Sequence, residues 1–277
     1  MPYTKILSPG LSEVGAVEER PLSVGGDEGV DEEDIQLGER FLSAYGVIEK
    51  CLRRKWGAPA GKESFRHLVN VLSKEDAVIR RFKDDLCEYA ELRNAIVHER
   101  TSPDYLIAVP RLETVLAIEE VAQTLANPPR VYPRFAKEVA ILPPSAVVAD
   151  LFNLMRRTDY TQFPVYNRNT YVGLITVGGI ARWAAQVAML DPKARIEDVL
   201  NSPVSDVLAC EKANRAAFIS KKATIYEAVD AFRSRPRDDK WGIAALLVTE
   251  SGKQTGKLLG IITPSDVLRF EKGGERP

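Results

Sequence analysis

The pattern of apolar and polar positions divides the chain into two halves of different character. In the first half, Leu37, Phe41, Tyr45, Ile48 and Leu52 follow one another at steps of three and four residues, which places them on one face of a helix. Long helices joined by short turns predict an antiparallel helical bundle. Further helices of the same kind are expected at about residues 62–72, 75–100 and 105–125, within a bundle that covers residues 31–126.

A proline-rich connector separates this bundle from the second half. Residues 127–133 contain three prolines, Pro128, Pro129 and Pro133, and such a segment is stiff and cannot continue a helix. Beyond it, short β-like runs alternate with amphipathic helices, which predicts α/β units. The expected fold class is therefore α+β multidomain, with a helical bundle followed by a tandem α/β pair.

The second half contains an internal repeat. In each copy an amphipathic helix precedes two short strands, and the second strand leads into another helix. With an opening strand before the first helix, two copies of strand–helix–strand–strand–helix are expected to pack as a pseudo-twofold unit. The matching segments are 147–155, 163–166, 173–176 and 180–183 in the first copy, and 224–232, 245–248, 260–263 and 267–270 in the second.

Composition narrows the classes of function. The formal net charge is −1, so the chain as a whole lacks the basic excess typical of nucleic-acid binding. Cys51, Cys87 and Cys210 are odd in number and far apart, which supports neither a disulfide framework nor a zinc site, and no metal is expected. With these cysteines a reducing cytoplasm is the expected compartment. No signal peptide and no membrane-spanning apolar run are visible in the sequence. Residues 1–30, which are acidic and glycine-rich, and residues 272–277 are expected to be tails, the first of them mobile.

The last strand-to-helix turn of the repeat carries a recognisable motif, Gly260-Ile261-Ile262-Thr263-Pro264-Ser265-Asp266. It resembles the signature of the CBS domain, and the two copies together resemble a CBS pair. The resemblance covers residues 134–271, with the first motif at 134–205 and the second at 206–271. It implies a mostly non-enzymatic domain that senses an adenine-containing ligand: AMP, ADP, ATP or S-adenosylmethionine.

The chemistry of this turn supports such a ligand independently of the family. A helix N-terminus has free N–H groups and a positive dipole end, which suit phosphate. The hydroxyl of Thr263 adds a donor, and the carboxylate of Asp266 can accept hydrogen bonds from both ribose hydroxyls. The same residues also form a good helix start, with Thr263 as the N-cap and Pro264 in the first position. Helix capping alone is therefore the alternative interpretation.

The resemblance also implies where adenine would bind. A CBS site that uses this aspartate takes its adenine contacts from the other motif, which here means Tyr160, Thr161 and Gln162. The lead-in segment near Lys137 is a further candidate. Tyr160 could instead be a residue of the hydrophobic core.

The two motifs differ at the position of the ribose acid. Gly179 stands in the first motif where Asp266 stands in the second, so the first site is expected to be empty or weak. Relatives often carry an arginine near the position of Ala244, where it meets phosphate. The alanine argues against tight binding of ATP.

In the first half, Arg93, Asn94 and His98 lie near the end of a predicted long helix. Their Arg-Asn-x-x-x-His spacing resembles a motif of the HEPN superfamily, and the resemblance covers residues 34–126. It implies a four-helix domain that dimerises. Many HEPN proteins are metal-independent ribonucleases that act as homodimers, whereas others only bind or only dimerise.

Helix geometry adds an independent constraint on this motif. Asn94 and His98 lie one turn apart on the same side of the helix, and Arg93 falls within the apolar arc. RNA cleavage without metal needs a base, an acid and a cation for the phosphate. The chain contains only two histidines, so two copies of the motif across a dimer would be needed. The alternative is structural, with Asn94 and His98 satisfying each other and Arg93 packed along a dimer seam.

These observations predict an adenine-nucleotide-sensing regulatory protein whose HEPN-like domain dimerises or acts as output. A HEPN ribonuclease gated by the CBS pair is the competing hypothesis, and a ligand-free interaction scaffold is the third. The expected partners are an adenine nucleotide, a second copy of the chain and, for the ribonuclease, RNA. No membrane partner is expected.

Overall fold

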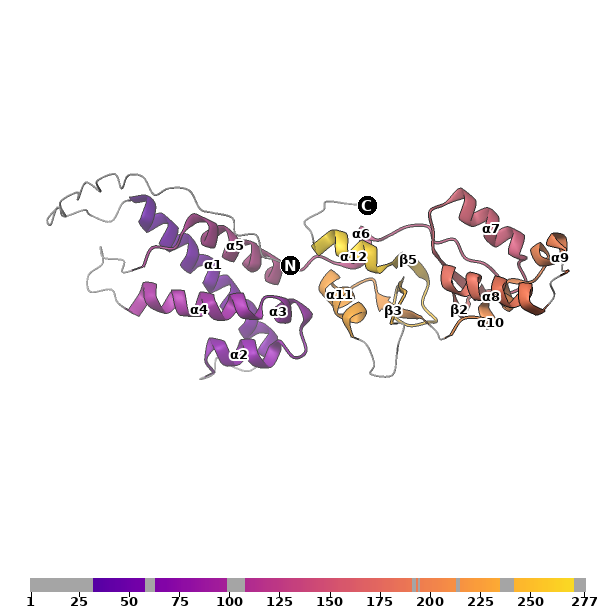
Figure 1. Ribbon diagram of the computed structural model, residues 1–277. Helices are drawn as coiled ribbons and strands as arrows, with labels where there is room; N and C mark the ends of the chain where they lie inside the picture. Colours follow the sequence, from indigo (N-terminus) through magenta and orange to yellow (C-terminus); the bar gives the residue numbers. More distant parts are fainter. Residues whose placement is uncertain are drawn as a thin grey trace, which may run out of the picture.

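The computed structural model describes residues 32–57, 63–98, 108–190, 193, 195–212, 215–234 and 242–271. In these ranges a helical domain is followed by a mixed α/β half, and the two lie end to end (Figure 1). The predicted tails, residues 1–30 and 272–277, lie outside the described residues. None of the helices in the described ranges has the length and apolar character needed to span a bilayer.

The helical domain buries one face of each of its helices in a common core. Its largest fully buried side chains include Phe41, Ile48, Leu68, Leu86 and Ile118, which come from four different helices. In α1 the predicted apolar face is confirmed, because Phe41, Tyr45, Ile48 and Leu52 are all buried. The helices are α1 (Glu32–Trp56), α2 (Phe65–Leu72), α3 (Ala77–Arg81), α4 (Lys83–His98) and α5 (Leu112–Ala126).

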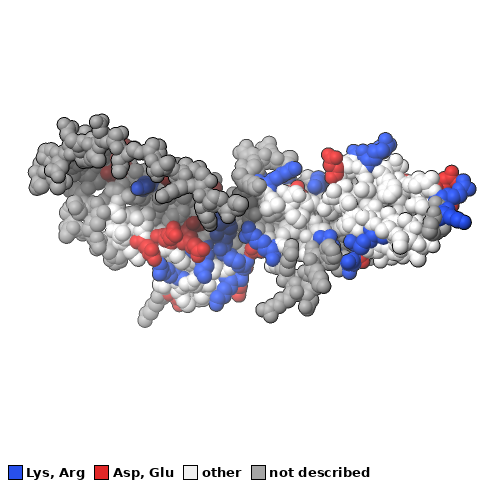
Figure 2. Space-filling model, viewed as in Figure 1, with Lys and Arg blue, Asp and Glu red and all other residues white. Residues whose placement is uncertain are grey.

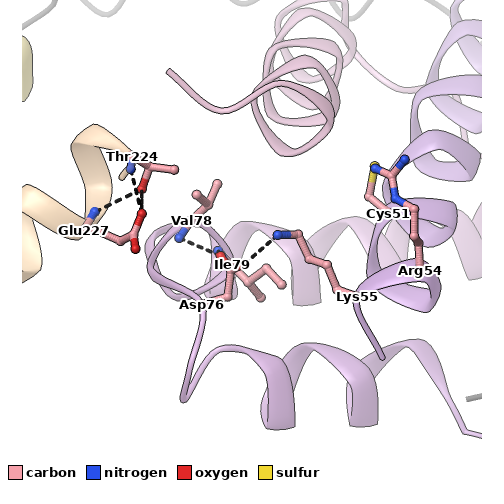
Figure 3. A network of polar contacts seen from close by, with 8 residues as sticks. All are labelled: Cys51, Arg54, Lys55, Asp76, Val78, Ile79, Thr224 and Glu227. Carbon is pink, nitrogen blue, oxygen red and sulfur yellow. Dashed lines mark hydrogen bonds and ion pairs between the residues drawn. The ribbon is translucent and has the colours of Figure 1, made fainter. Parts of the chain in front are cut away.

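The helix expected at residues 75–100 is wrong in one respect, because it is broken into α3 and α4 at Phe82. Asp76 fixes the start of α3 by accepting hydrogen bonds from the backbone N–H groups of Val78 at 2.9 Å and Ile79 at 3.0 Å. The same carboxylate forms an ion pair with Lys55 of α1 (Figure 3). The backbone at Phe82 leaves the helical region, with φ −103° and ψ 16°.

Two other helices begin later than the sequence pattern suggests. α2 starts at Phe65 because Ser64 caps it, accepting from the backbone N–H of His67 at 3.2 Å. α5 starts at Leu112 rather than near residue 105. Pro110 accounts for this, since a proline disfavours helical conformation at the residue before it.

The connector is docked on the α/β half. The N–H of Val131 donates to the carbonyl of Ala223, and the N–H of Ile225 donates to that of Pro129, each at 2.9 Å. These bonds attach the connector and its short helix α6 (Val131–Arg134) to the second copy of the repeat.

The first copy of the repeat forms a hairpin covered by helices. β1 (Gln162–Asn167) pairs with β2 (Thr170–Thr176) in antiparallel register, with Gln162 opposite Thr176. The opening strand of this copy is reduced to an isolated parallel bridge from Leu142 to Val165. The helices are α7 (Val148–Arg157), α8 (Val177–Leu190), α9 (Ile196–Leu200) and α10 (Val204–Ala209), and α10 crosses the boundary expected at residue 205.

The second copy forms the complete predicted unit. β3 runs parallel to β4, and β4 pairs in antiparallel register with β5. Tyr166, Tyr171 and Phe218 belong to a hydrophobic cluster that joins the two copies. The elements are β3 (Ala216–Ser220), α11 (Ile225–Arg233), β4 (Ala245–Thr249), β5 (Leu258–Ile262) and α12 (Pro264–Glu271).

The helical domain packs against α11 of this second copy. The ring of Phe82 lies edge-on to that of Tyr226, with 5.7 Å between ring centroids. On its other side Tyr226 contacts Phe270 of α12, at 6.0 Å. Arg80 forms an ion pair with Asp230 beside these rings. The break after α3 thus places Phe82 in the interface between the domains.

Candidate functional site

A cleft of about 920 Å³ lies between the two copies of the repeat. Both strand-to-helix turns open into it, because Thr176 at the start of α8 and Thr263 at the start of α12 line the same space. Residues predicted from different parts of the sequence meet here. The predicted site residues on its walls are Lys137, Tyr160, Thr161, Gln162, Thr263 and Asp266.

The turn into α12 has the geometry expected of an N-cap. Asp266 Oδ2 accepts hydrogen bonds from the backbone N–H of Thr263 at 2.7 Å and from the Thr263 hydroxyl at 2.8 Å. Both bonds use one carboxylate oxygen. Asp266 is half-exposed and faces the cleft, so its second oxygen, Oδ1, can accept from a ligand.

The same pair of hydrogen bonds occurs at a helix start that does not line the cleft. Glu227 Oε2 accepts from the N–H of Thr224 at 2.6 Å and from its hydroxyl at 2.9 Å, forming a capping box at α11 (Figure 3). Capping alone therefore accounts for the hydrogen bonds of Asp266. What sets Asp266 apart is its place on the wall of the cleft.

The predicted adenine-side residues Tyr160, Thr161 and Gln162 line the cleft at the entry to β1. Tyr160 is 40% exposed, so this tyrosine is not part of the hydrophobic core. Lys137 Nζ lies 5.9 Å from the centroid of its ring. The hydroxyl of Thr161 donates to Gln162 Oε1 at 2.8 Å. An aromatic face, an amide and a cation are therefore available together.

A close backbone approach explains why Lys137 reaches the cleft. The lead-in segment crosses the last strand of the second motif, where Ala136 forms a bridge with Gly260. A Cβ atom at position 260 would lie 2.1 Å from the carbonyl oxygen of Phe135. Only glycine fits here, which gives the first residue of the motif a physical role.

Two cations of the cleft were missed by the sequence analysis. Arg215 lines the wall beside Ala244, and its Nε donates to the carbonyl of Gly242 at 3.2 Å. It places a positive charge near the position where the sequence lacks the arginine of relatives. Arg269, two turns into α12, lines the same wall. Nothing in the sequence indicated Arg215, because it lies 45 residues before the Gly260–Asp266 motif.

The turn into α8 is filled by a residue that the sequence analysis also missed. Glu211 Oε1 accepts from the N–H of Thr176 at 2.6 Å and from its hydroxyl at 2.9 Å. The other oxygen, Oε2, is 2.9 Å from an NH2 group of Arg182. The first motif therefore does have a carboxylate at its turn, supplied from 35 residues away.

The residues of the Arg-Asn-x-x-x-His motif all belong to α4. Arg93 is half-buried and donates to Asn94 Oδ1 at 3.3 Å, whereas Asn94 is exposed. Burial raises the pKa of Tyr45 in α1 to about 12, Glu49 adds to the rise and Arg93 opposes it, so Arg93 lies within electrostatic reach of α1. The side chain of His98 lies outside the described residues.

Charge on the helical domain is mixed. Figure 2 shows positive and negative side chains interspersed over the visible face of this domain, while the same face of the C-terminal half is mostly uncharged. No group of three or more potential metal ligands occurs in the described ranges. The interspersed charges do not single out this face as one that would track a nucleic-acid backbone.

Comparison with known proteins identifies the C-terminal half. The CBS domain family model matches residues 135–186 and 196–273. A comparison with curated proteins gives no match. Solved structures similar to this chain include CBSX2 in complex with AMP, with 20% identity over 52% of this chain and 97% of that chain and a TM-score of 0.37.

Two further structures illustrate the range of similar proteins. One is the CBS domain of a bacterial CNNM/CorC family Mg²⁺ transporter in complex with ATP, with 20% identity over 53% of this chain and 89% of that chain and a TM-score of 0.37. The other is a CBS domain protein of Streptococcus pneumoniae, with 19% identity over 50% of this chain and 81% of that chain and a TM-score of 0.35. The family match covers both copies of the repeat, and the C-terminal half of this chain is a CBS domain pair.

Proposed function

We propose that this chain is a regulatory protein that senses an adenine nucleotide in the cleft of its CBS pair. The observation that carries the proposal is the position of Asp266, a helix-capping carboxylate that uses one oxygen for both capping bonds and lines a cleft together with an aromatic residue and cations. The helical domain is the proposed dimerisation or output part.

Each part of a nucleotide has a matching group on the walls. Ribose hydroxyls are donors, and Asp266 Oδ1 accepts them in a charge-assisted bond. Phosphate is favoured at the N-terminus of α12 by the helix dipole and by Lys137, Arg215 and Arg269. Adenine would stack on or beside Tyr160, with the Gln162 amide able to donate and accept at its polar edge.

The cleft lining carries three cations, Lys137, Arg215 and Arg269, and three carboxylates, Glu138, Asp159 and Asp266, so its net charge does not choose between a phosphorylated ligand and the sulfonium of S-adenosylmethionine. The three cations are the groups that would bind phosphate. AMP and ATP, the ligands of two similar CBS structures, are therefore the first compounds to test, together with ADP.

Calorimetry with AMP, ADP, ATP and S-adenosylmethionine tests the proposal. Asp266→Ala should weaken nucleotide binding by about 1.5–3 kcal/mol, because a charge-assisted ribose contact is lost. Asp266→Asn keeps an oxygen that can cap the helix and removes the negative charge, so it separates helix capping from ribose binding. Undetectable binding of all four compounds at millimolar concentration would contradict the proposal.

A route from the cleft to the helical domain runs along α12. Its first turn holds Asp266, and its last turn holds Phe270, which contacts Tyr226. Tyr226 in turn contacts Phe82 at the junction of α3 and α4. A tilt of α12 on nucleotide binding would move this series of three edge-on rings. Regulation of the helical domain through these ring contacts is part of the proposal.

Tyr226→Leu tests the route, because leucine fills part of the space and lacks the ring contacts. The variant should bind nucleotide as the wild type does. The nucleotide-dependent change in hydrogen exchange of α3 and α4 should be lost. A change that persists in the variant would show that the signal takes another path.

The ribonuclease alternative depends on α4, where Arg93 and Asn94 are hydrogen-bonded to each other. A working site would combine one Arg93 and one His98 from each of two chains. Cleavage should then persist in EDTA, leave a cyclic phosphate end and be abolished by Arg93→Ala and by His98→Ala in protein that stays dimeric. If the protein is a dimer and leaves varied single-stranded RNAs intact, with or without nucleotide, the ribonuclease alternative is rejected and nucleotide sensing is the remaining function.

A further inference from the structure

The proposed function makes no use of Glu211, a carboxylate with an unusual degree of burial for its type. Its side chain is 5% exposed, and it lies in the segment that leads into the second motif. Buried carboxylates require partners, and Glu211 has three: the N–H and the hydroxyl of Thr176, and the guanidinium of Arg182. Arg182 also donates to the carbonyl of Cys210, which fixes the adjacent backbone.

The contacts of Glu211 repeat those of Asp266 in the other motif. One oxygen of Glu211 receives the two Thr176 donors at 2.6 and 2.9 Å. One oxygen of Asp266 receives the two Thr263 donors at 2.7 and 2.8 Å. Each threonine is the residue directly before a helix of the cleft, α8 or α12. The two carboxylates therefore occupy equivalent places at equivalent turns.

Gly179 is the residue whose position in α8 matches that of Asp266 in α12, the third of each helix. A Cβ atom on Gly179 would lie 1.9 Å from Glu211 Oε1 and 2.4 Å from its carboxyl carbon. Two atoms cannot share this space. An acid at position 179 and the present position of Glu211 exclude each other.

The environments of the two carboxylates differ in one respect. Asp266 lines the cleft, and both of its capping bonds use Oδ2. The second oxygen of Glu211 is engaged by Arg182, at 2.9 Å. A ribose at this turn would have to displace a charged and hydrogen-bonded pair, which costs more than the new bonds return.

We infer that Glu211 acts as a built-in substitute for the missing acid and closes the first motif's turn to a ribose, although this turn lines the cleft, so that the chain takes one nucleotide. The inference rests on the proposed function for the identity of the ligand. It adds that Glu211, in addition to the glycine at 179, determines how many nucleotides bind.

A thermal double-mutant cycle tests the assignment without ligand. Gly179→Asp alone should lower the melting temperature by about 4 °C or more, because the new side chain collides with Glu211. In a Glu211→Ala background the same change should cost little, because the introduced aspartate can then cap Thr176 as Asp266 caps Thr263. Glu197→Ala, which removes an exposed carboxylate of the same motif, is the control background in which the full cost should remain.

Calorimetry with AMP then tests closure. Wild-type protein and Glu211→Ala should each bind one AMP per chain, and Gly179→Asp/Glu211→Ala should bind two. Equal melting costs of Gly179→Asp in all three backgrounds would overturn the assignment. A double variant that stays at one AMP would overturn closure by Glu211. Wild-type protein that binds no nucleotide would defeat the proposed function, while the melting cycle would still decide whether Glu211 occupies the place of the acid.

Discussion

At the start of α12 and at the start of α8, a threonine directly precedes the helix and a carboxylate accepts from its N–H and hydroxyl. In α12 that carboxylate is local, three residues after the threonine, and it faces the cleft. In α8 it comes from 35 residues away and is held by Arg182. Two copies of one motif have thus kept the same capping requirement and met it differently. Both turns line the cleft; we call the α12 side the open half and the α8 side, where Arg182 binds the second oxygen of the carboxylate, the closed half.

The lead-in segments explain how this difference arises. The segment before the first motif crosses Gly260 of the second and brings Lys137 to the open half. The segment before the second motif reaches Gly173 of the first through Leu208, and then brings Glu211 to the closed half. The two lead-in segments thus occupy equivalent places, and one places Lys137 at the open half while the other places Glu211 at the closed half.

The capping box of α11 provides a third case for this comparison. Thr224 and Glu227 make the same bonds, and neither residue lines the cleft. Capping geometry alone therefore does not define a ligand site. What makes a site is a carboxylate oxygen left over for a ligand, next to groups that complement the rest of that ligand.

The largest expected effect comes from the pseudo-equivalent arginines, Arg182 in α8 and Arg269 in α12, each six residues after its threonine. Arg182→Ala should lower the free energy of unfolding by about 2–3 kcal/mol, because it leaves the buried charge of Glu211 with its remaining donors only. Arg269→Ala should leave stability within about 0.5 kcal/mol of wild type. Urea denaturation of both variants checks the contrast, and equal costs would remove the distinction between a closed and an open half.

The next effect concerns the glycines that the lead-in segments approach. Gly260→Ala should cost about 2–3 kcal/mol of unfolding free energy, because its Cβ would meet a backbone carbonyl that cannot move alone. Gly173→Ala should cost about 1 kcal/mol, because its Cβ would meet the end of the flexible Leu208 side chain at 2.7 Å. Denaturant midpoints give both values. If Gly173→Ala costs more unfolding free energy than Gly260→Ala, the contact at Gly260 is not the more rigid of the two, and this account is contradicted.

The smallest effect is on nucleotide affinity at the open half. Lys137→Ala and Arg269→Ala should each weaken AMP binding by about 0.5–1 kcal/mol, because each removes one exposed cation near phosphate. The loss should shrink as salt is raised. Calorimetry at two salt concentrations measures it. Lys193→Ala, outside the cleft lining, serves as the control and should change neither value.

The open half was predictable because its chemistry is local in sequence. Thr263 and Asp266 are three residues apart, and Tyr160 to Gln162 are consecutive, so a motif can show them. The repeat and the amphipathic spacing likewise predict the CBS pair and the helical core. The extra break at Phe82 was not predictable, because the ring that accompanies it, Tyr226, belongs to the other domain.

The closed half could not be predicted from the sequence, because its contacting residues are far apart along the chain. Gly179 indicated only that an acid was missing, and nothing near it in sequence points to Glu211. The carboxylate arrives through the packing of α10 on β2, which sets the direction of the next residues. Arg215 is a similar case, since its proximity to Ala244 depends on the pairing of β3 with β4.

The most direct test of the central claim is a calorimetric titration of AMP into wild-type protein, Asp266→Asn and Glu227→Gln. Both substitutions alter a capping carboxylate in the same way, but only Asp266 lines the cleft. Wild type and Glu227→Gln should bind one AMP per chain with equal affinity. Asp266→Asn should bind roughly 10- to 150-fold more weakly while remaining folded. Equal binding by all three proteins, or no binding by any of them, would contradict the account.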